Sequence, residues 1–132
     1  MLAGRCVVVR SVVSIIVAAA LIIAGGIFEC LYLDRTFDEL TEVYSDIYEK
    51  LENDACTVED SSAAMDVWFD KKEQLHAFIP HTEIKEVDLW AFELNEYVAQ
   101  GENEEAKAKA AVILGLFDKI PRSFSLRAGN LL

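Results

Sequence analysis

Residues 11–28 read SVVSIIVAAALIIAGGIF, eighteen consecutive residues without a charged side chain. As a helix this stretch rises roughly 27 Å at about 1.5 Å per residue, close to the ~30 Å hydrocarbon core of a bilayer. Apolar residues continue on both sides, at positions 7–9 and 31–33. The stretch therefore predicts one transmembrane helix, which contacts membrane lipid through residues 11–28 and anchors the rest of the chain.

The charges that flank this stretch predict its orientation. Arg5 and Arg10 precede it, and no acidic residue occurs before Glu29. Basic residues near a membrane segment stay on the cytoplasmic side. We expect a single-pass protein of the cell membrane with a cytoplasmic N-terminus and an extracytoplasmic C-terminal part.

A cleaved secretion signal is the alternative interpretation of the same residues. Arg5 and Arg10 resemble its basic region, residues 12–23 its apolar region, and residues 24–26 a small-residue cleavage site. Apolar residues continue at Ile27, Phe28 and positions 31–33, so cleavage would leave an apolar new N-terminus. We therefore favour the uncleaved anchor.

Small residues repeat along one face of the predicted membrane helix, at Ser11, Ser14, Ala18 and Gly25. Small side chains let membrane helices approach closely. A homodimer through this face is a further hypothesis.

The remainder of the chain is strongly acidic. All 23 acidic residues and ten of the 12 basic residues lie in residues 29–132, which therefore carry a net charge of −13. Such a domain is repelled by nucleic acid and by anionic headgroups, so its partners are expected to be cations or basic protein surfaces. We divide the chain into a cytoplasmic stub and anchor, residues 1–34, and one exported acidic domain, residues 35–132.

Apolar residues at helical spacing predict four amphipathic helices after the anchor. The first stripe is Leu33, Phe37, Leu40, Tyr44, Ile47 and Leu51, and the second is Val58, Met65, Trp68, Phe69, Lys72, Leu75 and Ile79. The third is Ile84, Val87, Ala91, Leu94 and Val98, and the fourth is Ala106, Ala110, Ile113, Phe117 and Ile120. These stripes must bury one another, so we predict an all-α protein with an N-terminal transmembrane helix and an antiparallel bundle of about four helices.

Local signals predict where these helices begin and end. Thr57 with Asp60 resembles a capping box, and Thr82 and Asn103 are expected N-caps. Gly101 is the expected left-handed residue after the third helix. Pro80 and Pro121 are expected to end the second and fourth helices.

Several motifs together resemble a known family. They are the Trp68 to Lys72 spacing, residues 78–81 with Ile84, Gly101 before Glu105-Ala106, and Phe124-Ser125-Leu126. With the N-terminal anchor, they are similar to the domain of unknown function 4363 family of small, N-terminally anchored helical proteins from Gram-positive bacteria. The resemblance implies the same architecture and brings no assigned activity.

The sequence contains no pattern that predicts a reaction. His76 and His81 are five residues apart across Pro80, and a zinc site needs three or four convergent ligands. No glycine-rich phosphate loop or nucleophile elbow is present, and the three cysteines form no framework. We therefore expect no catalytic residue, no metal and no cofactor.

The most informative side chains are aromatic and lie around the second and third predicted helices. Trp68 and Phe69 are consecutive, so both cannot face one core centrally, and part of this surface is expected to remain exposed for a partner. The predicted partner or ligand surface consists of Trp68, Phe69, Lys72, His81 and Trp90. The leading hypothesis is an interaction or assembly module that binds an unknown envelope protein; the alternative is a small-molecule or cation-binding sensor near His81, and an enzyme is the last choice.

Overall fold

The computed structural model describes residues 2–131, which form four helices and contain no strand. The helices are α1 (Leu2–Glu52), α2 (Val58–Leu75), α3 (His81–Ala99) and α4 (Asn103–Leu131). The predicted all-α class is confirmed. The chain divides into two compact units, residues 1–32 and residues 33–132, and α1 contributes to both.

The first unit is a helix whose large apolar side chains are exposed. The valine, isoleucine, leucine and phenylalanine side chains between Val7 and Leu31 are all exposed, from 48% at Val12 to 70% at Phe28. By length and composition this helix is able to cross a membrane, and none of its most apolar 18-residue window is buried.

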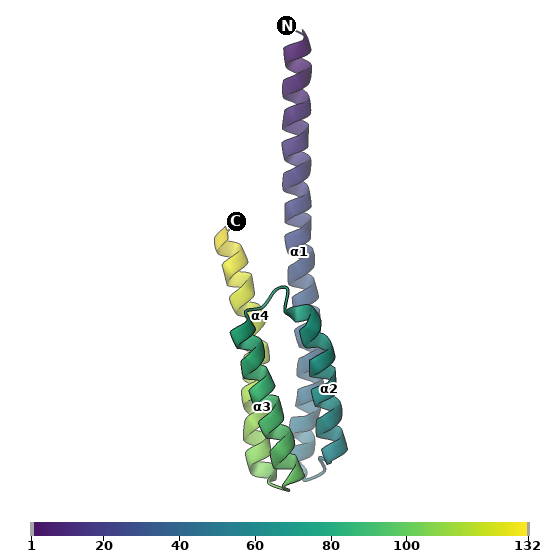
Figure 1. Cartoon of the computed structure of the whole chain (residues 1–132), viewed down its shortest axis with the longest axis vertical. Helices are drawn as coiled ribbons and strands as arrows, with labels where there is room; N and C mark the ends of the chain where they lie inside the picture. The colour runs from purple at the N-terminus through teal and green to yellow at the C-terminus, as the bar shows by residue number, and fades with distance from the viewer. Residues whose placement is uncertain (1, 132) are drawn as a thin grey trace. The chain divides into compact units, whose positions relative to one another are not determined.

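The second unit is a bundle of the C-terminal part of α1 with α2, α3 and α4. Successive helices run in opposite directions, joined by short connections at alternate ends (Figure 1). Every residue of the first, third and fourth predicted stripes is buried. Small residues Ala91, Ala106 and Ala110 lie in the core and let α3 and α4 approach closely.

The second predicted stripe is correct only in part. Trp68, Leu75 and Ile79 are buried as expected, but Val58 is 42% exposed. Ser61 and Ala64, which were not predicted, complete the buried face of α2. Ser61 tolerates burial because its hydroxyl donates to Asn95 Oδ1 of α3 at 2.6 Å.

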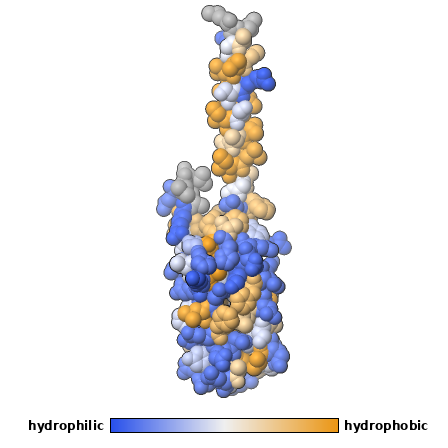
Figure 2. All heavy atoms as spheres, in the orientation of Figure 1, coloured by the Kyte–Doolittle hydropathy of each residue, from blue (hydrophilic) through white to orange (hydrophobic). Residues whose placement is uncertain are grey.

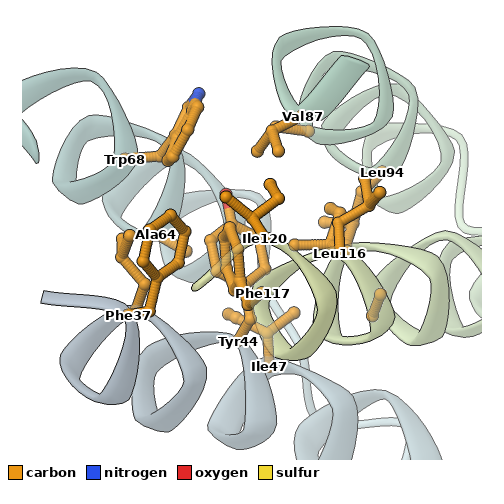
Figure 3. Close-up of a cluster of buried hydrophobic side chains, with 14 of the residues drawn as sticks. Phe37, Tyr44, Ile47, Ala64, Trp68, Val87, Leu94, Leu116, Phe117 and Ile120 are labelled. Atoms are coloured by element: carbon orange, nitrogen blue, oxygen red, sulfur yellow. The ribbon is translucent and has the colours of Figure 1, made fainter. Parts of the chain in front are cut away.

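Phe117 of α4 is at the centre of the aromatic core. Its ring centroid lies 5.8 Å from Phe37, 5.5 Å from Tyr44 and 5.8 Å from Trp68. These partners come from α1 and α2, so one side chain joins three helices (Figure 3). Burial raises the pKa of the Tyr44 phenol, because the phenolate would lose its hydration.

Two of the predicted helix ends are confirmed in detail. Thr57 Oγ1 accepts from the Asp60 amide and the Asp60 carboxylate accepts from the Thr57 amide, a complete capping box. Gly101 has φ +74°. Its amide donates to Val98 and the Glu102 amide donates to Tyr97, which is the Schellman pattern.

Four other predicted boundaries are wrong or displaced. α3 begins at His81 after an N-cap at Pro80 without a side-chain hydrogen bond, so Thr82 is not its cap. Asn103 is the first residue of α4, and its side-chain amide instead donates to Asp54 at 2.9 Å. α2 ends at Leu75, before Pro80, and α4 continues through Pro121.

Candidate interaction surface

Trp68 is a core residue, although the sequence suggested it for a partner surface. Its side chain is 0% exposed. Its indole Nε1 donates to Asp88 Oδ1 of α3 at 2.6 Å, and Lys72 Nζ donates to the other oxygen of that carboxylate at 2.9 Å. Asp88 therefore joins both side chains of α2 to α3 and gives the buried indole N–H its acceptor.

Phe69, one residue further along α2, lies at the edge of the bundle. Its ring packs against Phe92 of α3 at 5.6 Å between centroids, and Lys72 Nζ lies 4.2 Å from its ring centre. Phe92 remains 52% exposed, and Leu89, three residues before it, is 54% exposed. We name Phe69, Leu89 and Phe92 the α2/α3 apolar patch.

Charged side chains surround this patch. Asp66 and Glu73 lie three residues before and four residues after Phe69, and Glu96 lies four residues after Phe92, which places each beside the patch on its helix surface. All three are exposed, and within the described residues none forms an ion pair. One exposed cation, Lys85, lies four residues before Leu89.

Trp90 belongs to a different contact, between α3 and α4. Lys109 Nζ lies 4.6 Å from the Trp90 ring centre and 3.1 Å from Glu93 Oε2. The Trp90 indole N–H is buried and has no hydrogen-bond partner within the described residues. Trp90 therefore does not extend the α2/α3 apolar patch.

His81 lies at the start of α3, where the turn from α2 brings it close to His76. The two ring centroids are 5.6 Å apart, and both side chains are exposed. Among residues 2–131 no group of three or more histidine, cysteine, aspartate or glutamate side chains is arranged to hold a metal ion.

A second surface feature is an open groove of about 410 Å³ between α1 and α4. Asp34 and Asp38 line it from α1, and Asp118 and Arg122 from α4, over the edges of Phe37 and Phe117. Arg122 is held by Asp118 at 3.1 Å. The remaining charge of the groove is negative, which suits an organic cation rather than an anion.

The structure thus separates the five residues that the sequence grouped. Phe69 and Lys72 lie together at the α2/α3 edge, Trp68 is beneath them, and His81 and Trp90 belong to other contacts. The predicted surface did not include Asp88, Leu89 or Phe92; the sequence placed Phe92 in the same aromatic cluster and Asp88 near the histidines, but gave no indication of Leu89. Leu89 and Phe92 lie off the apolar stripe of their helix, and this was the signal that could have found them.

These observations define a small all-α protein with an uncovered apolar helix and an acidic four-helix bundle. The chain belongs to the family described as Domain of unknown function (DUF4363), which matches residues 27–131. Comparisons with curated proteins and with solved structures find no match.

Proposed function

We propose that this protein is a membrane-anchored interaction module, in which the N-terminal helix crosses the cell membrane and the acidic bundle binds a protein of the cell envelope. The observation that carries the proposal is the α2/α3 apolar patch. Leu89 and Phe92 are more than half exposed on α3, whose other large aliphatic side chains are buried. Exposed aromatic and aliphatic groups in one place are typical of a partner surface.

The length and composition of the first unit support the anchor. Its exposed apolar side chains would be unfavourable in water and favourable in lipid. Arg5 and Arg10 favour a cytoplasmic N-terminus, which gives the bundle an extracytoplasmic location. A tethered module meets membrane-bound partners at a high effective concentration, so a small patch is sufficient for binding.

Site-specific photo-crosslinking in intact cells tests this function. A photoreactive residue replaces Phe92 in one variant and Val112, an exposed apolar residue of α4, in the matched control. We expect position 92 to give a discrete crosslinked protein and position 112 to give none. Equal labelling at both positions, or no crosslink at position 92, contradicts the proposal.

A second candidate function is the binding of an organic cation, and the groove between α1 and α4 favours it over a site at His81. Its walls carry three aspartates and one arginine. A ligand that binds only the folded protein raises the unfolding temperature. Thermal unfolding of the full chain in nanodiscs with spermidine therefore tests this candidate: it predicts stabilisation that Asp34→Asn/Asp38→Asn removes and that Glu42→Gln/Glu49→Gln leaves unchanged.

A further inference from the structure

We infer that the partner of the α2/α3 apolar patch is a basic amphipathic helix. This helix lies along the line where α2 and α3 meet, which we call the seam; its walls are Val58, Met65 and Phe69 of α2 and Leu89 and Phe92 of α3. The inference rests on the proposed function and adds the chemical class of the partner. It follows from the length of the apolar seam, from the charges that flank it, and from the comparison of a basic helix with a second copy of this chain.

The seam is long enough for a helix. Val58, Met65 and Phe69 are spaced seven and four residues apart, so they share one edge of α2. Val58 is exposed, and Met65 and Phe69 are half-buried. Eleven residues of α2 correspond to about 16 Å, which three turns of a partner helix cover with anchors at positions i, i+4, i+7 and i+11.

The seam also has apolar side chains on its second wall. Phe92 of α3 contacts Phe69 across the seam, and Leu89 is one turn away from Phe92. Apolar anchors of a partner would remove these exposed surfaces from water, which is favourable by about 25 cal/mol per Å² of apolar area. Figure 2 shows orange and tan side chains interrupting the blue surface on this face of the bundle.

The charges that flank the seam indicate that the partner is positively charged. Asp66 and Glu73 flank the α2 side and Glu96 the α3 side. Against these three carboxylates stand Lys85 and Lys72, and the ammonium of Lys72 is already paired with Asp88. Lysine and arginine side chains beside the apolar anchors of a partner helix would meet these carboxylates. The net charge of −13 on residues 29–132 would attract the same partner over a longer range.

A second copy of this chain fits the seam poorly. It would bring an equally acidic bundle, and the same carboxylates would face one another at the contact. An anionic lipid surface is disfavoured for the same reason. A basic helix is the occupant that covers the apolar seam and also neutralises its edges.

The test uses the full chain in phosphatidylcholine nanodiscs and a fluorescent 14-residue helical peptide of leucine and lysine. A leucine and glutamate peptide of the same pattern is the charge control, and empty nanodiscs give the lipid background. We expect the lysine peptide to bind above this background, and its apparent Kd to rise roughly tenfold or more in Leu89→Ser/Phe92→Ser. The matched variant Val112→Ser/Leu126→Ser changes two exposed apolar residues of α4 and should bind like the natural chain.

A second pair of variants separates the local carboxylates from the overall charge. Asp66→Asn/Glu73→Gln/Glu96→Gln and Glu42→Gln/Glu49→Gln/Glu52→Gln each remove three exposed negative charges. We expect the first triple to weaken binding several-fold more than the second and to reduce its dependence on salt. Equal effects of the two triples, equal binding of the glutamate peptide, or no loss in Leu89→Ser/Phe92→Ser overturns the inference.

The outcome for the inference is distinguishable from the outcome for the proposed function. Crosslinking at position 92 in cells without binding of the lysine peptide leaves the interaction function standing and excludes the basic helix. Absence of the crosslink contradicts the function itself.

Discussion

Asp88 shows how one residue on α3 determines the role of two residues on α2. Its carboxylate accepts from the buried indole of Trp68 and from Lys72, which in turn lies over Phe69. The same contacts hold Trp68 in the core and hold Phe69 at its edge beside Phe92. The geometry of the α2/α3 apolar patch therefore depends on a carboxylate that does not belong to it.

The first prediction concerns Asp88→Ala, which removes the acceptor of a buried N–H. An unsatisfied buried donor costs about 1–3 kcal/mol of unfolding free energy. Asp88→Asn keeps one acceptor oxygen for the indole but loses the charge and the second acceptor that Lys72 uses, so its cost should be smaller than that of Asp88→Ala. Thermal unfolding followed by circular dichroism measures both. Equal losses in the two variants would show that the indole hydrogen bond contributes little.

The second prediction concerns Asp60 and pH. The Thr57 amide, which donates to the Asp60 carboxylate, and Lys50, which pairs with it at 3.2 Å, lower the pKa of Asp60 below its ordinary value of 3.8. A lowered pKa in the folded state means that the stabilisation is complete above the ordinary value and is lost as pH falls through the folded value.

The difference in unfolding temperature between the natural chain and Asp60→Asn should therefore be largest near neutral pH and shrink below about pH 4. Asp70→Asn, on the exposed face of the same helix, is the control for the loss of one negative charge from α2. A constant difference for Asp60→Asn down to the most acidic pH would contradict the prediction.

At the scale of the helices, two glycines offer opposite expectations for the same substitution. Gly101 follows α3 with φ +74°, while Gly115 lies inside α4, and a Cβ at either position meets no atom within 4 Å. Gly101→Ala should therefore cost about 1 kcal/mol through backbone strain alone. Gly115→Ala should stabilise by about 0.5–1 kcal/mol, because alanine favours the helix interior. The reverse order of unfolding temperatures would contradict the assignment of the third helix end.

Helix ends show which parts of the fold the sequence could predict. The capping box at Thr57 and Asp60 and the glycine end at Gly101 are local arrangements, so a few residues suffice to recognise them. Thr82 and Asn103 have suitable side chains, but α3 begins one residue before Thr82 and the Asn103 amide bonds to Asp54, 49 residues earlier. Pro121 lies within α4, where Phe117 and Ile120 are buried before the missing N–H and Phe124 packs against the core after it.

The candidate surface was less predictable than the fold, for a related physical reason. Buried stripes follow from periodicity within one helix, and three of the four were complete. The α2/α3 apolar patch instead depends on which helices pair and in which register, since Phe69 meets Phe92 from 23 positions away. Trp68 and Phe69 are neighbours in sequence. Only the way α2 packs against α3 determines that Trp68 is buried in the core and that Phe69 lies at its edge.

At the scale of the whole molecule, the surface of the first unit is suited to lipid and the surface of the second unit is suited to water. The first exposes apolar side chains almost throughout, and the second has a buried core and a surface rich in carboxylates. The apolar helix contributes favourable transfer into lipid, while an acidic bundle is repelled by anionic headgroups. This contrast supports the proposed membrane-anchored interaction module.

The last prediction is the direction of insertion, tested with two single-cysteine variants in intact cells. One keeps Cys6 and the other carries Glu52→Cys, both at exposed positions, with the remaining cysteines replaced by alanine. A maleimide that cannot cross membranes should label position 52 in intact cells and Cys6 only after lysis, because Arg5 and Arg10 resist translocation. The opposite labelling pattern would reverse the topology. A chain recovered from the medium without Cys6 would instead identify residues 1–26 as a cleaved signal, because cleavage after Gly26 removes both arginines together with most of the apolar helix.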